Sequence, residues 1–300
     1  MTDINYQHIG SYNEYGFQEG FIKQFEKNSR YSWKSIPEML VLLRLIGNDP
    51  GIVDIRWAAY MLATVMWETT SPIVWEEWAK DKKGKPLIDK KGKAIMVKRR
   101  AWLMTMAPVD EIGHGKGRRY QDPVKVAVLC DGSVRITEQD GDQFLISTIG
   151  VVKKLKKGAK MGADADGPIS KIYLDDDGTE HIYYGRGYVQ LTWWSNYAQS
   201  GIAIGRGFDL LLDPDLVKEA AVAYMLMSHG MRTGEGFANG HKFSEFFSGQ
   251  SRNYKGARKM VNGTDKAEEI AKLAEAFEKV LFEALPTMLP SSRMPLITYC

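Results

Sequence analysis

The sequence YYGRGYVQLTWWSNY, residues 183–197, sets aromatic side chains directly beside short polar ones. Glycines on both sides of Arg186 allow the backbone to turn tightly or to approach a ligand closely. A sugar has apolar ring faces and hydroxyl groups, so it suits a surface of this composition. The alternative is a strand-turn-helix corner whose aromatic side chains fill a core. The residues alone leave both interpretations open.

Three separated motifs resemble those of glycoside hydrolase family 19, the chitinase class with a lysozyme-like fold. YYGRGYVQLTW resembles the family signature, and WETT at residues 67–70 resembles the HETT segment that carries the catalytic acid. MVNGTDKAEEIAKLAEAFEKVL at 260–281 resembles the late Asn-Gly turn and the closing helix. With PVDEIGHGKGR at 108–118, the chain is most similar to the phage and bacterial endolysin branch, many members of which cut peptidoglycan.

The resemblance implies one catalytic domain over residues 1–300, mainly α with α+β lysozyme-like character, in which two helical lobes surround a cleft. Apolar periodicity and capping signals predict helices over roughly 17–25, 35–46, 55–69, 213–229 and 265–281. Ser35, Asp54, Asp213 and Asp265 are the expected N-caps.

Glycosidic cleavage needs a protonated carboxyl group and a second carboxylate. Glu68 is the expected acid, because burial and the negative end of an apolar helix both raise the pKa of a carboxyl group. Glu111 is the expected base, because a glycine-rich loop leaves it hydrated near cationic side chains. Asp110 is its immediate rival. One residue departs from the family pattern: Trp67 stands where the chitinases have histidine.

The resemblance also implies a substrate site. Family 19 enzymes invert the anomeric centre, which requires a water between carboxyl groups roughly 6.5–9.5 Å apart. Thr192 matches the residue that helps to position this water. Arg186 either braces its loop by ion pairing or contacts sugar, and Tyr184 and Trp193 either stack on sugar or pack in the core. The full set of expected substrate-binding residues is Gln190, Asn196, Asn262, Tyr184, Trp193 and Arg186.

Two segments have no place in the expected family core. Residues 80–100 are rich in lysine and arginine and predict a β-hairpin or mobile loop, either a solvated face or a contact for an anionic polymer. Residues 123–182 alternate short apolar runs with DG, GD and DDDG turns, which predicts an inserted β-rich subdomain. It could bind cell wall, bind a partner, or only elaborate the fold.

The amino-acid composition indicates where the protein is made and which ligands it is expected to lack. The chain has 300 residues and a net charge of +3. It contains only two cysteines, and this low count indicates a protein made in a reducing cytoplasm. Neither a signal peptide nor a transmembrane segment is apparent. The five histidines lack paired metal-ligand spacing, so we expect no metal and no cofactor. Nucleic acid is not expected as a partner, because the aromatic residues lie away from the basic region.

The sequence therefore predicts a peptidoglycan glycan-strand hydrolase of the lysozyme type, acting as a monomer by general acid/base catalysis. It would be made in a bacterial cytoplasm and reach the periplasmic cell wall through a holin or a secretion machine. The alternatives are a family 19 chitinase, a secreted antibacterial effector with a cognate immunity protein, and a non-catalytic wall-binding protein.

Overall fold

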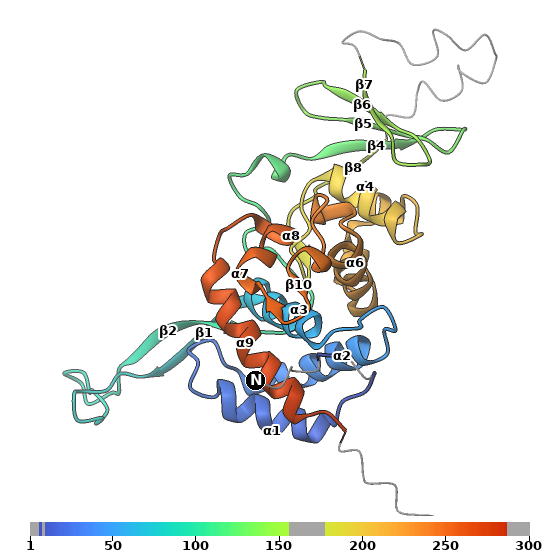
Figure 1. The fold of residues 1–300 in the computed structure, drawn as a ribbon. Helices are drawn as coiled ribbons and strands as arrows, with labels where there is room; N and C mark the ends of the chain where they lie inside the picture. The colour runs from blue at the N-terminus through green and yellow to red at the C-terminus, as the bar shows by residue number, and fades with distance from the viewer. Residues whose placement is uncertain (1–5, 8–9, 156–177, 287–300) are drawn as a thin grey trace, which may run out of the picture.

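The structure is a computed structural model that describes residues 6–7, 10–155 and 178–286. A helical body carries two β projections, a long hairpin and a five-stranded sheet (Figure 1). The larger helices are α1 (Glu14–Phe25), α2 (Ile36–Gly47), α3 (Ile55–Glu68), α4 (Trp194–Ala203), α6 (Ala220–Thr233) and α9 (Ala267–Glu283). The short ones are α5 (Asp209–Leu212), α7 (Tyr254–Ala257) and α8 (Lys259–Asn262). The fold is α+β, and the expectation that it is mainly α is not confirmed, because several small sheets accompany the helices.

Helix α3 is the buried centre of the helical body. Its N-cap Asp54 accepts a hydrogen bond from the Arg56 backbone N–H at 2.8 Å, as the sequence predicts. Helix α9 lies beside it, and α1 packs on α9, where the rings of Phe25 and Phe277 meet with centroids 4.7 Å apart. Apolar residues on all sides of α3 fix its position, so its last residue, Glu68, is held at a defined place.

Three of the predicted helix starts differ in detail. Ser35 does not cap α2, because its hydroxyl donates to the Ser32 carbonyl at 2.6 Å. Asp213 caps only the 3₁₀ helix Pro214–Lys218, and α6 begins separately at Ala220. Lys266, in a left-handed conformation, occupies the N-cap position of α9 that we expected of Asp265. For Ser35, the local partner Ser32 explains the difference from the prediction.

The basic segment forms the outer part of a β-hairpin. Strands β1 (Thr70–Trp78) and β2 (Met96–Met104) pair antiparallel from Thr70↔Met104 to Trp78↔Met96. The ribbon continues through bridges between Lys80 and Pro86 and between Ile88 and Ala94. It projects from the body, with exposed apolar side chains among its lysines and arginines (Figure 1).

The second projection is an antiparallel sheet in the order β7-β6-β5-β4-β8. Its strands are β4 (Val124–Val128), β5 (Val134–Thr137), β6 (Gln143–Ile146), β7 (Val152–Lys154) and β8 (Thr179–His181). Residues 156–177 of the predicted insertion lie outside the described residues. The sheet rests on α4, where the rings of Phe144 and Trp194 have centroids 5.1 Å apart. Its standing as a separate inserted subdomain stays a prediction.

Two very short pairs complete the described strands. Strand β3 (Val109–Asp110) pairs with β9 (Arg186–Gly187), which brings the 108–118 loop against the glycine-flanked arginine. Strand β10 (Phe247–Ser248) pairs with β11 (Ser251–Arg252). The β3–β9 pair matters most for function, because it joins two segments that the sequence separately marked as candidate site regions.

Candidate active site

A cavity of about 520 Å³ opens where the end of α3, the loop after β3, the β9 turn and the end of α8 meet. It collects five of the residues predicted from sequence, namely Glu68, Glu111, Gln190, Thr192 and Asn262. The remaining lining residues are Thr70, Ser71, Val109, Asp110, Ile112, Arg118, Tyr120, Gly185, Val189 and Val261. The predicted residues Asn196, Tyr184, Trp193 and Arg186 are not among those that line it.

Glu68 is the last residue of α3 and its side chain is only 16% exposed. Its Oε1 accepts a hydrogen bond from an Nη of Arg258 at 2.5 Å. Burial raises the pKa of Glu68, while the adjacent Arg258 charge opposes that rise. A carboxyl group with a raised pKa holds its proton to higher pH, which is what a general acid requires.

The threonine that follows Glu68 fixes the end of the helix. The Thr69 hydroxyl donates to the Val65 carbonyl at 2.7 Å and accepts from the Met106 backbone N–H at 3.2 Å. Its carbonyl accepts from the Thr105 hydroxyl at 2.9 Å. The preceding Trp67 is half-buried against the core, with the Arg30 guanidinium 3.7 Å from its ring centroid. These contacts hold the carboxyl group on the cavity side of α3.

Glu111 is held by two donors of different kinds. The Tyr120 hydroxyl donates to its Oε1 at 2.8 Å, and the Gly185 backbone N–H donates to its Oε2 at 3.1 Å. A carboxylate can only accept, so these two donors hold the Glu111 side chain in one orientation. In return, burial and the neighbouring Glu111 charge raise the pKa of Tyr120 to about 12, so the phenol stays a donor. Glu111 thus has a hydrogen-bonding environment suited to a base.

Gly185 suits this close approach. A Cβ added there would lie 3.0 Å from the Gln190 Oε1 and 3.1 Å from the Glu111 Cβ. Both contacts are tighter than is usual for a Cβ, so a larger residue would push on Gln190 and Glu111. The first glycine of the GRG motif therefore lets the backbone N–H reach the Glu111 carboxylate.

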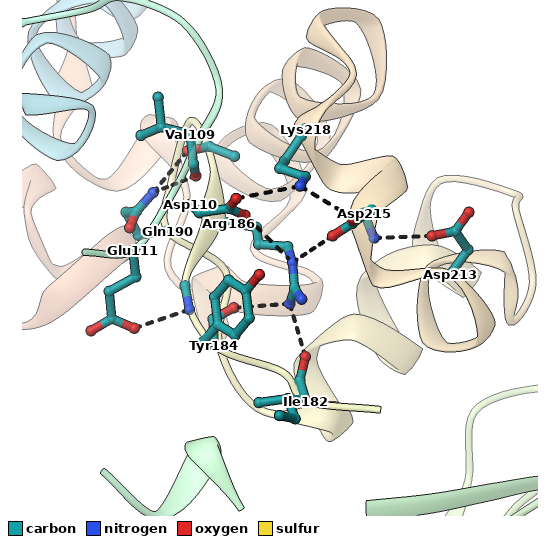
Figure 2. A network of polar contacts seen from close by, with 12 residues as sticks. Val109, Asp110, Glu111, Ile182, Tyr184, Arg186, Gln190, Asp213, Asp215 and Lys218 are labelled. Carbon is teal, nitrogen blue, oxygen red and sulfur yellow. Dashed lines mark hydrogen bonds and ion pairs between the residues drawn. The ribbon is translucent and has the colours of Figure 1, made fainter. Parts of the chain in front are cut away.

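Asp110 occupies a different electrostatic setting from Glu111. Its Oδ2 lies 3.3 Å from the Lys218 Nζ, and its Oδ1 lies 3.7 Å from the Arg186 Nε. Figure 2 shows Asp110 pointing toward these cations and Glu111 pointing away from them. Asp110 is therefore held in ion pairs with Lys218 and Arg186, whereas Glu111 accepts its hydrogen bonds from Tyr120 and Gly185.

Arg186 is a brace. Its side chain is 7% exposed, and its Nε pairs with Asp215 at 3.0 Å. An Nη donates to the Ile182 carbonyl at 2.9 Å (Figure 2). It also donates to the Tyr197 hydroxyl at 3.2 Å. Ile182 precedes β9, Tyr197 lies in α4 and Asp215 lies in the 3₁₀ helix Pro214–Lys218, so Arg186 ties the GRG turn to both helices. Of the two roles that the sequence left open, bracing is the one its contacts fit.

Tyr184 cannot stack on a sugar in this structure. The His114 ring lies parallel to it at a centroid distance of 4.4 Å, and the Arg186 guanidinium lies 3.6 Å from its centroid. Two groups this close to one ring centre must occupy opposite faces. Both faces of Tyr184 are therefore covered, and the ring packs the 108–118 loop against the GRG turn.

Two residues predicted to contact sugar donate hydrogen bonds to backbone carbonyls of the site. The Gln190 Nε2 donates to the Val109 and Gly187 carbonyls, each at 3.1 Å, and so ties β3 to β9 at the cavity wall. The Asn196 Nδ2 donates to the Thr192 carbonyl at 2.9 Å. Asn196 thus positions Thr192 from outside the cavity, whereas Gln190 and Asn262 remain within reach of a ligand.

Trp193 lies on a neighbouring cavity. The indole is 40% exposed and meets the Tyr120 ring edge-on at a centroid distance of 5.6 Å. The adjacent Trp194 is buried, and its Nε1–H donates to Glu138 at 2.8 Å. Of the two tryptophans, only Trp193 presents a surface to a ligand.

Sequence reasoning missed Arg258 and Tyr120 as site residues. Arg258 is 1% exposed and pairs with a carboxyl group 190 positions away in the chain. Tyr120 follows the glycine-rich loop and contacts Glu111 nine positions earlier. The position of Tyr120 beside a loop expected to be functional was a usable signal, whereas nothing local marks Arg258.

Within the described ranges, one cluster of three acidic residues has its carboxylate oxygens close enough together to hold a metal ion. Carboxylate oxygens of Glu138, Asp140 and Asp142 lie within 4.8 Å of one another near the turn between β5 and β6. They stand apart from the cavity that holds Glu68 and Glu111. Lys154 pairs with Asp142, and Trp194 donates to Glu138, so protein groups already engage two of the three.

No helix in the described part of the chain combines the length and apolarity that crossing a membrane requires.

Comparison with known proteins supports part of the resemblance. The model of the family described as "Chitinase class I" matches residues 163–229, which contain the GRG stretch, α4 and most of α6. "Inactive chitinase-like protein 1" of Hevea brasiliensis is 35% identical over 95 residues, covering 27% of this chain and 29% of that protein. No solved structure matches significantly. The similarities support a relationship to glycoside hydrolase family 19 and make glycosidic-bond hydrolysis the chemistry to test.

Proposed function

We propose that this protein hydrolyses the glycan strand of peptidoglycan by general acid/base catalysis, with Glu68 as the acid and Glu111 as the base. One observation carries the proposal: the two carboxyl groups line a single cavity in opposite environments. Burial favours the protonated form of Glu68, whereas Glu111 accepts hydrogen bonds from the Tyr120 hydroxyl and the Gly185 backbone N–H. Such a division of roles is what glycosidic cleavage requires.

In the proposed reaction, Glu68 donates its proton to the glycosidic oxygen as the bond from that oxygen to the anomeric carbon breaks. Glu111 takes a proton from a water molecule whose oxygen bonds to the same carbon on the opposite face. The products are a new reducing end and a free hydroxyl group, with the anomeric configuration inverted. Thr192, on the cavity wall, would orient the water, and Gln190 and Asn262 would contact the sugars.

The preference for peptidoglycan rests on the likeness of the loop at 108–118 to the phage and bacterial branch and on the basic hairpin. Bacterial walls are anionic, and lysines and arginines on β2 and the hairpin tip would favour adsorption to them. The proposed place of action is accordingly the cell wall, reached in a phage or effector context.

Chitin is the second candidate substrate, favoured by the description of the matched family as chitinase class I. A non-catalytic binding role is the third, because the matched Hevea protein is named inactive. The presence here of both Glu68 and Glu111 in one cavity argues for activity in this chain.

Digestion of two purified polymers tests the proposal. Peptidoglycan and colloidal chitin would each be incubated with the wild-type protein, and soluble products would be analysed by mass spectrometry. We expect disaccharide-repeat fragments with new reducing ends from peptidoglycan. Release of N-acetylglucosamine oligomers from chitin alone would transfer the assignment to a chitinase. Binding without cleavage of either polymer by the folded protein would contradict a hydrolase.

A further inference from the structure

A second cavity, of about 450 Å³, lies beside the first. Its lining comes from the loop before β4, the turn between β5 and β6, and the start of α4; the residues are Arg119, Tyr120, Asp122, Val124, Glu138, Gln139, Asp140, Tyr183, Trp193 and Trp194. Tyr120 lines both cavities and donates to Glu111 in the first. The two cavities therefore adjoin at Tyr120.

Trp193 is the main apolar surface of this second cavity. Its backbone has φ 71° and ψ 132°, a conformation that is strained for a bulky residue. Its indole is 40% exposed, so core packing does not account for the strain. The edge-on contact with Tyr120, at an interplanar angle of 78°, holds the side chain in place at the cavity. An exposed indole held in a strained conformation at a cavity is typical of a ligand platform.

Another part of the lining belongs to the five-stranded sheet. Glu138 accepts a hydrogen bond from the Trp194 indole, which fixes the β5–β6 turn against α4. This turn brings Gln139 and Asp140, both exposed, to the cavity. An aromatic platform facing carboxylate and amide groups matches the apolar face and the hydroxyl groups of a pyranose ring.

Charge narrows the ligand class further. Three carboxylates, of Asp122, Glu138 and Asp140, line this cavity with a single guanidinium, that of Arg119. Such a lining disfavours a phosphate or a polyanion and favours a ligand rich in hydroxyl donors.

We propose that the second cavity is an accessory saccharide subsite, in which Trp193 stacks on a sugar of the strand whose neighbouring part occupies the first cavity. The inference rests on the proposed function and extends it, because it gives the sheet a role in substrate binding. A strand long enough to pass Tyr120 is held in both cavities, whereas a disaccharide in the first cavity is not.

The test measures binding as a function of strand length. Glu68→Gln serves as the slowed background, and calorimetry measures its affinity for two-sugar and six-sugar strands prepared from peptidoglycan and from chitin. Adding Trp193→Ala should weaken six-sugar binding by about tenfold and leave two-sugar binding unchanged, because only the longer ligand reaches the indole. Trp193→Phe should retain most of the affinity. Trp78→Ala, which removes an indole that is 51% exposed on the hairpin, is the matched control.

Each result has a distinct meaning. Equal affinities of the background and Trp193→Ala variants for the six-sugar strand would overturn the subsite and leave the proposed function intact. Failure of both strand types to bind the folded background protein would overturn the proposed function as well. Should Trp193→Ala fold poorly, the double variant Gln139→Ala/Asp140→Asn tests the same cavity from its exposed turn, with the same length-dependent loss expected.

Discussion

The Arg258 guanidinium lies 2.5 Å from the Glu68 carboxylate, and both groups are largely removed from solvent. Arg258 also donates to the Asp265 carbonyl at 2.9 Å, so the turn that follows Asn262 is tied to the same side chain. Burial and the arginine charge act on Glu68 in opposite directions, with burial the larger. The pKa of Glu68 therefore depends on burial first and on Arg258 second, and Arg258 belongs neither to the helix nor to the motif that contains Glu68.

Replacing Arg258 should change the pH dependence of catalysis. Because the arginine charge lowers the pKa of Glu68, Arg258→Gln should raise that pKa and move the alkaline limb of the kcat/KM profile to higher pH. Arg258→Lys, which keeps the charge, should move it less. Initial rates across a pH series on a soluble glycan measure both limbs. An alkaline limb at the same pH in all three proteins would contradict the assignment of Glu68 as the acid.

The raised pKa of Glu68 also predicts a pH-dependent stability difference. The pKa of Glu68 is higher in the folded than in the unfolded state. Such a carboxyl group contributes its full stabilisation when the pH is below its pKa in the unfolded state. That contribution is lost as the pH rises through its pKa in the folded state. Relative to wild type, Glu68→Gln should therefore gain stability as the pH is raised from about 4 to 8. Melting temperatures of both proteins over this range measure the trend. A constant difference would show that Glu68 has the same pKa in both states.

Gly185→Ala should damage catalysis more than stability. The added methyl group would press on Glu111 and Gln190, which are 3.1 Å and 3.0 Å from its position, and displace the base. We expect a loss of at least about tenfold in kcat, because general-base catalysis is sensitive to such misplacement. Gly16→Ala on α1 is the control, since its nearest neighbour would be a side-chain atom at 3.4 Å. Equal activity of the two variants would argue against Glu111 as the base.

Removing the Arg186 brace should destabilise the protein. Arg186→Met deletes three hydrogen bonds of a buried guanidinium and its ion pair with the exposed Asp215, at a cost of roughly 3 kcal/mol. Arg99→Met, which breaks an exposed pair with Glu77, should cost under about 1 kcal/mol. Urea unfolding of both variants provides the comparison. Similar losses in the two would mean that Arg186 is not the structural brace inferred from its contacts.

Local patterns predicted much of the helical framework. The apolar stripe and the Asp54 cap located α3, and with it the place of Glu68, because both signals lie within one helix. The glycines around Arg186 correctly marked a tight turn, and Gly185 permits a 3.1 Å hydrogen bond to Glu111. Turn residues and alternating apolar positions likewise predicted strands between residues 123 and 182.

The parts that sequence could not predict depend on contacts between distant segments. Arg258 meets Glu68 across 190 positions, and Gln190 reaches the Val109 carbonyl across 81. Tyr184 was a plausible sugar platform until packing placed His114 and Arg186 against its ring. Spacing shows which residues share an element, whereas the partners that cover a ring or neutralise a charge are fixed only when elements pack.

The assignment of the catalytic pair is tested most directly by counting new reducing ends. Wild type, Glu68→Gln, Glu111→Gln and Asp110→Asn would be incubated with purified peptidoglycan, after thermal unfolding shows that each variant is folded. We predict reducing ends from wild type and Asp110→Asn, and a loss of about a hundredfold or more in each glutamate variant. Full activity in Glu111→Gln together with inactivity in Asp110→Asn would contradict the pair and assign the base to Asp110.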